Sequence, residues 1–483
     1  MDILASTNIA LGLACVTTPA LAEEFTTQTV NVGSQPQAVV TVDVDRNGLA
    51  DIVSAVQLDG TVSITLALGQ GSFAPAPVLL TGGQPVDVAA ADLDGDTFPD
   101  LVVLDAGTEE LGASLGRGDG TFDPAVKVEI GASPQSVLLG DVTGDGLIDA
   151  VVLRDSFSHP ICWLPGLGDG TFGEPIIPTM ALNARAGVLA DVNDDGLNDL
   201  ALVDTDANAV FVLLGDPLGG LLPPGEGIPV GTDPVAITAA DLNDDEVPEI
   251  ITANTTSGDI SVLGNDGAGN FSASVDFDVG ANPTDVDVGD VTGDGTRDFV
   301  VSLGGASTLG VFSADGVGGI ELVADIPTGL VPVSIAIADL NGDFFLDIVS
   351  SDAFGNTLTI AESTVGPWVD VGFEMPGPLG TADLSAAGIP RAGSTVRLDT
   401  KGVPAGTFGL LVFGSRRVNT PVGNVVVVPS QTVLLPVTAG ELISFEWPSA
   451  APVGDDVYIQ AFFPFTPGGL AATNALRTIT QNP

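Results

Sequence analysis

The sequence predicts an all-β protein: a seven-bladed β-propeller followed by a small β-sandwich. Three observations support this prediction. An acidic nonapeptide recurs seven times at intervals of 49 or 50 residues. Short apolar or alternating runs flank the copies, as expected for strands with a buried face. The 62 Gly and 34 Pro residues are spread along the chain and favour turns over long helices.

The acidic repeat extends over most of the chain. Its seven copies begin at Asp43, Asp92, Asp141, Asp191, Asp241, Asp290 and Asp339. A period of this length is typical of architectures in which each unit buries its faces against the next unit.

Each unit follows one plan of four strands. An alternating apolar run precedes the nonapeptide, as at 86–90, and a second apolar run follows it, as at 101–104. A third run, as at 209–214, comes before a glycine-rich turn such as 118–122, and a fourth run follows at 126–130. Four short strands in one period of this size correspond to one propeller blade.

The two ends of the repeat complement each other. The seventh unit stops near residue 361 without a fourth strand, and a strand-like run at 25–32 precedes the first unit. We expect residues 25–32 to complete the seventh blade, because a closed ring leaves no sheet edge open to aggregation.

These units resemble the FG-GAP/VCBS repeats of integrin α-subunit-like β-propellers. The acidic nonapeptides and the Gly-Asp-Gly-Thr-Phe turns at 118–122 and 168–172 carry the resemblance, which covers about residues 25–364. The resemblance implies a propeller domain at 23–364 with calcium in the acidic loops. It is much less specific for function.

The acidic loops place oxygen atoms at alternate positions of a tight turn. Positions 1, 3, 5 and 9 offer side-chain oxygens and position 7 offers its carbonyl, which suits the roughly six to eight hard oxygen ligands of Ca²⁺. The candidate ligands of the first three loops are Asp43, Asp45, Asn47, Leu49 and Asp51; Asp92, Asp94, Asp96, Phe98 and Asp100; and Asp141, Thr143, Asp145, Leu147 and Asp149. Those of the fourth and fifth loops are Asp191, Asn193, Asp195, Leu197 and Asp199, and Asp241, Asn243, Asp245, Val247 and Glu249. Those of the sixth and seventh loops are Asp290, Thr292, Asp294, Thr296 and Asp298, and Asp339, Asn341, Asp343, Phe345 and Asp347.

The number of carboxylates favours a bound cation. Solvated Asx-turns are the alternative explanation, but three or four converging carboxylates repel one another strongly without a cation. Up to seven Ca²⁺ ions, one per blade, would supply 14 positive charges against the 22 carboxylates at positions 1, 3, 5 and 9. Mg²⁺ is disfavoured because it requires octahedral geometry and retains its waters.

The sixth position of each loop requires a sharp turn. Four loops have glycine there, namely Gly48, Gly146, Gly196 and Gly295, and the other three have Thr97, Glu246 and Phe344. We expect those three loops to bend differently. The fifth loop departs furthest because Glu249 replaces the final Asp, so its metal site is the weakest prediction.

The amino terminus predicts export. Residues 1–22 read as a signal peptide because a short apolar stretch ends in Ala20-Leu21-Ala22. A buried first strand is the alternative, and a lipoprotein signal at Cys15 is disfavoured by Gly12. Cleavage would leave Cys162 as the sole cysteine, which excludes an intramolecular disulfide. We expect a secreted protein, either extracellular, periplasmic or on the cell surface.

The period ends near residue 364, and 365–483 is expected to form the β-sandwich. Strand-like runs separated by Gly and Pro occur at 395–398, 408–413, 425–428, 432–435, 442–447, 458–463 and 477–480. Four aromatic residues there could form a carbohydrate platform, but we expect core positions for Trp447, Tyr458, Phe462 and Phe463.

The charge composition disfavours two classes of binding partner. The chain has 12 Lys+Arg against 63 Asp+Glu, a formal net charge of −51, which disfavours nucleic acid and anionic membranes as partners. No later stretch has the roughly 20 apolar residues that would insert into a membrane. The excess acidity suits either solubility in a saline environment or simply an acidic secreted surface.

The chain has few residues of the types that commonly act in catalysis, and this favours a non-enzymatic role. The chain has one His and one Tyr, and we expect His159 to be structural. The favoured function is adhesion or binding to an extracellular protein or polysaccharide. The alternatives are a polysaccharide lyase or glycosidase on a propeller scaffold, which needs a base or paired acids in a pocket, and a structural surface protein.

Overall fold

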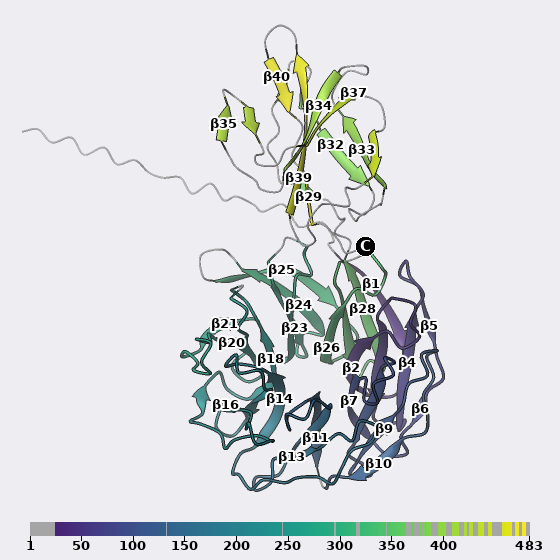
Figure 1. Ribbon diagram of the computed structural model, residues 1–483, viewed down its shortest axis with the longest axis vertical. Helices are drawn as coiled ribbons and strands as arrows, with labels where there is room; N and C mark the ends of the chain where they lie inside the picture. Colours follow the sequence, from purple (N-terminus) through teal and green to yellow (C-terminus); the bar gives the residue numbers. More distant parts are fainter. Residues whose placement is uncertain are drawn as a thin grey trace, which may run out of the picture.

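The computed structural model describes residues 25–131, 133–243, 245–293, 296–314, 319–343 and 345–363, together with the backbone of short strands between residues 369 and 479. Residues 25–363 form seven antiparallel sheets around a common axis (Figure 1). The seven-bladed propeller predicted from the repeat is therefore confirmed.

Each sheet is one blade, and its strands follow the chain from the axis outward, except that β1 is the outermost strand of blade seven. Blades one to three contain β2 (Pro36–Val42), β3 (Asp51–Val56), β4 (Thr61–Ala67), β5 (Phe73–Pro75) and β6 (Leu79–Leu80); β7 (Pro85–Ala91), β8 (Asp100–Asp105), β9 (Glu110–Ser114) and β10 (Val126–Glu129); and β11 (Pro134–Gly140), β12 (Asp149–Arg154) and β13 (Ile161–Leu164). Blades four and five contain β14 (Ala184–Ala190), β15 (Asp199–Asp204), β16 (Ala209–Leu213) and β17 (Ile228–Pro229), and β18 (Pro234–Ala240), β19 (Glu249–Asn254), β20 (Asp259–Leu263) and β21 (Val275–Asp278). Blades six and seven contain β22 (Pro283–Gly289), β23 (Asp298–Leu303), β24 (Thr308–Ala314) and β25 (Ile320–Pro327), and β26 (Pro332–Ala338), β27 (Asp347–Asp352), β28 (Thr357–Ser363) and β1 (Phe25–Asn31).

The amino-terminal strand closes the ring. β1 pairs antiparallel with β28 over its whole length, from Phe25 opposite Ser363 to Asn31 opposite Thr357. In Figure 1 the purple β1 lies beside the green β28, although more than three hundred residues separate them in sequence. The expectation that residues 25–32 complete blade seven is confirmed.

The core of the propeller lies between the blades. Among the residues that the structure describes, seven clusters of buried apolar side chains occur, one at each junction between neighbouring blades. The cluster between blades one and two, for example, contains the fully buried Ile64 and Leu101. Because each sheet buries both faces against its neighbours, the second strands β3, β8 and β12 are completely buried, and the residues between their first and last positions are mostly apolar.

The third blade departs from the four-strand plan. Its expected fourth strand is reduced to one bridge, in which Trp163 and Ile176 exchange backbone hydrogen bonds of 3.1 and 2.8 Å. Pro175 and Pro178 flank this bridge. Proline has no amide hydrogen, so this segment cannot extend the ladder in either direction.

Every inner strand has a register irregularity near its first residues. In two blades, an acidic side chain on the inner strand also accepts a backbone amide from the inner strand of the next blade. Asp87 on β7 accepts the Val137 amide of blade three at 2.9 Å, and Asp285 on β22 accepts the Ile335 amide of blade seven at 2.8 Å. Burial raises the pKa of Asp87 to about 6 and that of Asp285 to about 7, although these hydrogen bonds oppose the increase.

Beyond the propeller the structure gives backbone strands. These are β29 (Val369–Asp370), β30 (Pro376–Gly377), β31 (Gly380–Thr381), β32 (Asp383–Ala387), β33 (Thr395–Lys401), β34 (Phe408–Gly414), β35 (Thr420–Val422), β36 (Val425–Val427), β37 (Val433–Thr438), β38 (Ile443–Glu446), β39 (Asp456–Phe465), β40 (Gly469–Ala472) and β41 (Leu476–Ile479). All seven runs expected to form strands overlap one of them. The sandwich packing, and the core positions of its aromatic residues, lie outside the described residues and stay predictions.

The predicted signal peptide at 1–22 also lies outside the described residues. Within the described part of the chain, no helix is long and apolar enough to span a membrane.

Candidate metal centres

The seven acidic loops lie at one end of the propeller. Each nonapeptide connects the inner strand of its blade to the second strand, as the first loop does between β2 and β3. Equivalent connections in a propeller emerge on the same face, so the sequence repeat becomes a ring of acidic loops.

The ninth position of each loop is a buried anchor. Asp51 is fully buried, and its two carboxylate oxygens accept the Val44 amide at 2.9 Å and the Ala67 amide at 2.7 Å. Asp51 thus fastens the beginning of the loop to the end of the third strand. Five further loops repeat buried contacts of this kind at Asp100, Asp149, Asp199, Asp298 and Asp347. The nonapeptide pattern predicts only metal binding for these residues and does not indicate this structural role.

The other side chains of the loop organise its turn. In the fourth loop, Asp191 Oδ2 accepts the Gly196 amide at 2.7 Å, and Asn193 Oδ1 accepts the Asp195 amide at 3.0 Å. Asp195 Oδ1 accepts the Leu197 amide at 2.9 Å. Because a carboxylate oxygen carries two lone pairs, each keeps capacity for a cation after accepting one amide. The first, second, third, fifth and seventh loops make related contacts through Asp43, Asp45 and Asn47; Asp92, Asp94 and Asp96; Asp141 and Asp145; Asp241, Asn243 and Asp245; and Asp339, Asn341 and Asp343.

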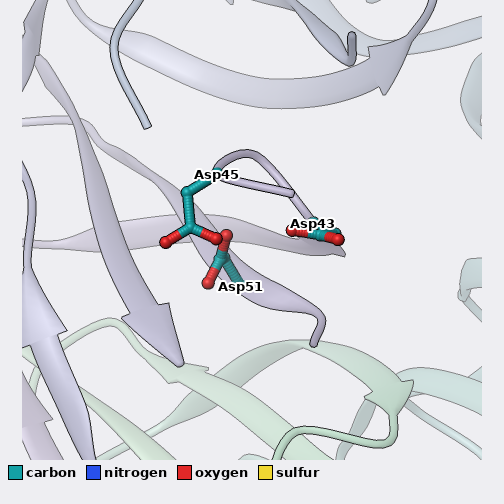
Figure 2. A group of neighbouring side chains, drawn as sticks. All are labelled: Asp43, Asp45 and Asp51. Carbon is teal, nitrogen blue, oxygen red and sulfur yellow. The ribbon is translucent and has the colours of Figure 1, made fainter. Parts of the chain in front are cut away.

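Two loops bring three carboxylates together. Oxygen atoms of Asp43, Asp45 and Asp51 lie within 4.8 Å of one another, and a second group contains Asp92, Asp94 and Asp100. Figure 2 shows the first group gathered beside its loop. Burial raises the pKa of Asp51 to about 6, and the charges of Asp45 and Asp43 add to the increase. A divalent cation would relieve this repulsion.

Threonine occupies the third position of two loops. The hydroxyl oxygens of Thr143 and Thr292 are buried without a hydrogen-bond partner among the described residues. An unpartnered buried oxygen is costly, and a metal ligand at this position would satisfy it. The donor set of the loops therefore fits a hard divalent cation: carboxylates, side-chain oxygens and the carbonyls of Leu49, Phe98, Leu147, Leu197, Val247, Thr296 and Phe345 at position 7.

The sixth position corrects one expectation. Thr97 and Glu246 have φ angles of 73° and 71°, close to the 87° of Gly48 and the 83° of Gly146. These loops bend in the same way as the glycine loops, and the prediction that they bend differently was wrong. The hydrogen bonds to the first-position carboxylate hold the side-chain-bearing residues in this strained conformation, with the Thr97 amide 2.9 Å from Asp92 Oδ2. Phe344, Gly295 and the candidate ligand Asp294 lie outside the described residues.

The fifth loop closes with the longer Glu249. Its Oε2 accepts the Leu242 amide at 2.9 Å, and its Oε1 accepts the Asn243 side-chain amide at 3.1 Å. Glu249 is 4 % exposed, so it replaces the usual aspartate as an anchor. Metal binding at this loop stays a prediction.

The glycine-rich turn of one blade lies against the acidic loop of the preceding blade. The Gly120 amide donates to the Val44 carbonyl at 3.1 Å, and the Gly220 amide donates to the Val142 carbonyl at 2.8 Å. Arg46 of the first loop also lies over the Phe98 ring of the second loop, 4.9 Å from its centroid. The candidate sites are therefore placed at blade junctions, which no local sequence pattern indicated.

The seven sheets and their ring of acidic loops define a β-propeller whose repeats match a known family. A model for FG-GAP-like repeats matches residues 43–103, 141–202, 191–252 and 241–301. The chain is therefore a β-propeller that contains FG-GAP-like repeats. No curated protein shows significant sequence similarity to it.

Solved structures share the fold at low identity. Two structures of BBS1N in complex with ARL6DN, from crystals soaked with mercury or lead, have TM-scores of 0.51 and 0.50. Both are 13 % identical, and the alignments cover 71 % of this chain and 99 % of theirs. A catalytically inactive virginiamycin B lyase from Staphylococcus aureus with quinupristin is 15 % identical, covers 70 % of this chain and 99 % of its own, and has a TM-score of 0.47. Identities this low show similarity of fold alone.

Proposed function

We propose that this protein is an exported, calcium-binding propeller that binds an extracellular protein or polysaccharide and is not an enzyme. The observation that carries the calcium proposal is the convergence of three carboxylates in each of two loops. Calcium suits these sites because it accepts irregular geometry and many oxygen ligands. The −51 formal charge adds to the demand for cations.

The nucleophile and base candidates support a non-enzymatic role. His159 is exposed in a loop at the opposite end of the propeller from the acidic loops, and its Nδ1 lies 2.9 Å from the Ser158 hydroxyl. Cys162 is buried, and burial raises the pKa of its thiol to about 11. A protonated, enclosed thiol is a poor nucleophile.

Exposed apolar side chains support macromolecular binding. Leu58, Leu330 and Phe354 are 64, 61 and 63 % exposed on loops at the end of the propeller opposite the acidic loops. Those loops are connected, since the Phe354 amide donates to the Leu330 carbonyl at 3.1 Å and the Gln35 amide donates to Asn356 Oδ1 at 3.0 Å. Exposed apolar groups of this kind favour a protein partner. BBS1N, which shares the fold, was solved in complex with ARL6DN.

Calorimetric titration with CaCl₂ tests the calcium proposal. The wild-type chain should bind several equivalents, and MgCl₂ should bind more weakly. Asp92→Asn combined with Asp94→Asn should remove about one equivalent, whereas Asp276→Asn, on the exposed face of β21, should leave the stoichiometry unchanged. Absence of calcium binding by the wild-type chain would refute the proposal.

Separate measurements test export, binding and the enzymatic alternative. The mature amino terminus should be Glu23 when the exported protein is sequenced. Arrays of glycans and extracellular proteins should identify a ligand whose retention depends on calcium. Turnover of a polysaccharide that disappears on mutation of a carboxylate outside the acidic loops would instead establish an enzyme.

A further inference from the structure

A small cavity lies at the junction of blades one and two. Leu79 and Leu80 on β6 cover one side together with Thr81, and β8, β9 and β10 of blade two form the other side. The cavity has a volume of about 20 Å³, above the roughly 10–15 Å³ that one water needs. Leu80 is 74 % exposed, so the cavity borders solvent. It therefore has room for one or two groups of about the size of water, which can enter from outside.

Two polar side chains in the lining are buried and have an oxygen without a partner. Asp105 is 4 % exposed and Ser114 is fully buried. Within the described part of the chain, Asp105 Oδ2 and Ser114 Oγ make no hydrogen bond. Leu101, opposite Ser114 in the β8–β9 register, lies four residues before Asp105, so the two polar side chains share one face of the sheet. Because an unpaired buried acceptor is costly, this face favours a group that donates hydrogen bonds.

The hydrogen bonds of Asp105 differ from those of its counterpart in blade four. Asp105 Oδ1 accepts three backbone amides, at 2.7, 2.9 and 3.0 Å, and Oδ2 accepts none. Asp204 also accepts three amides, but its Oδ2 takes one of them, from Asn183 at 2.8 Å. The same position of the blade thus has both oxygens satisfied in blade four and one left over in blade two.

Small residues make room for this cavity. Gly112 of blade two takes the ladder position that Phe211 has in blade four. Ser114 likewise takes the position of Leu213. Blade two therefore has a gap and a hydroxyl group where blade four has two large apolar side chains.

The charge of Asp105 has no basic partner at the cavity. Lys127 lies at the edge, where its Nζ donates to Glu110 Oε2 at 3.0 Å and to the Thr81 carbonyl at 2.8 Å. Among the described residues, no Lys or Arg side chain forms an ion pair with Asp105. A water molecule could donate to Asp105 Oδ2 but would leave the charge unbalanced, and burying an unpaired charge is costly. A positively charged donor satisfies both demands.

We propose that this cavity binds the ammonium group of a small primary alkylamine. One N–H would donate to Asp105 Oδ2, and the positive charge would balance the carboxylate. The alkyl chain would lie against Leu79 and Leu80 toward solvent. Ser114 Oγ is about 13 Å away along the strand, too far for the same ammonium group, and a water satisfies it. No residue that lines the cavity belongs to an acidic loop, so the proposal does not depend on calcium binding.

Calorimetric titration of the full chain with n-propylammonium chloride tests this proposal. Sodium chloride at about 0.15 M screens the exposed carboxylates. We expect one saturable site with a dissociation constant on the order of 1 mM. Asp105→Asn keeps the shape and the Oδ1 acceptor but removes the charge, and it should weaken binding by about tenfold or more. Asp276→Asn, on the exposed face of β21, removes the same charge elsewhere and should bind as wild type does.

A second variant tests the cavity without changing its carboxylate. A Cβ added at Gly112 lies 3.3 Å from the Ala125 Cβ, so Gly112→Ala narrows the cavity and should also weaken binding. Melting temperatures show whether each variant is folded. Tetramethylammonium has the same charge as propylammonium but no N–H donor, and it should not bind at this site.

The other outcomes would overturn the proposal. Equal binding of propylammonium by Asp105→Asn and wild type would exclude Asp105 as its acceptor. Equal binding of tetramethylammonium would show that attraction between charges, rather than a donated hydrogen bond, accounts for the affinity. Absence of saturable binding by the wild-type chain would leave water as the occupant of the cavity.

Discussion

Substitution of the buried anchor Asp149 separates the structural role of the ninth position from metal binding. Asp149 is fully buried and accepts the amides of Val142, Thr143 and Gly166 at 2.9, 2.8 and 2.8 Å. Asp149→Ala deletes all three hydrogen bonds and leaves the amides buried without partners. Hydrogen bonds to charged groups contribute about 1.5–3 kcal/mol each, so three of them at the lower end of that range correspond to a loss of about 4.5 kcal/mol.

The expected loss can be measured as a melting temperature in EDTA. An unfolding entropy of about 2.1 cal/mol/K per residue over roughly 340 residues of propeller is about 0.7 kcal/mol/K, so the melting temperature should fall by about 6 °C. Trp163 lies in the same blade and reports unfolding by fluorescence.

Asp145→Ala is the matched control. Asp145 is exposed at the fifth position and accepts only the Leu147 amide, at 2.9 Å. In EDTA its substitution should lower the melting temperature by less than about 2 °C, whereas in CaCl₂ it should remove the stabilisation from one site. Equal losses for the two variants in EDTA would refute the distinction between anchor and metal-binding positions.

Three further predictions follow from the loops and the inner strands. Saturating CaCl₂ should raise the melting temperature, by about 1.4 kcal/mol per site at ten times the dissociation constant, and a scan in EDTA with no change would contradict this. Thr97→Gly should stabilise the chain by about 1 kcal/mol in urea unfolding, because it relieves a φ of 73°, and a loss of stability would show that the threonine is not strained. Burial raises the pKa of Asp87 to about 6 and that of Asp285 to about 7, above the usual aspartate pKa of about 3.9, so the folded chain binds more protons than the unfolded chain between these values. Stability in EDTA should therefore fall as the pH rises from about 4 to about 7, and combined Asp87→Asn and Asp285→Asn should reduce this fall; an unchanged slope would contradict the assignment.

Local sequence was sufficient to predict structure wherever residues of one type at a regular spacing determine the local conformation. The alternating run at 86–90 falls within the inner strand β7, and the run at 101–104 falls within β8. The seventh repeat lacks a fourth strand, and we therefore expected the amino-terminal segment to complete blade seven as β1, because an open sheet edge is unfavourable. The acidic positions of the first loop predicted the convergence of Asp43, Asp45 and Asp51.

Residue type at a single position, or the repeat pattern alone, gave wrong predictions where other contacts or residues determine the backbone conformation. Thr97 and Glu246 lack the freedom of glycine, yet they take the same turn because backbone amides bond to the first-position carboxylate. The fourth strand of blade three was expected from the repeat, but Pro175 and Pro178 reduce it to a single bridge. Neither outcome follows from propensity at one position.

The chain alone determined that there are seven units, where their strands lie and which loops are acidic, because periodicity and alternation are properties of neighbours in sequence. Folding decided which oxygen atoms are buried anchors, which turn covers which loop, and that Glu362 meets Gln28 and Gly71 where blade seven adjoins blade one. Those contacts join residues up to 334 positions apart. They exist only because the ring closes and places the first and last blades side by side.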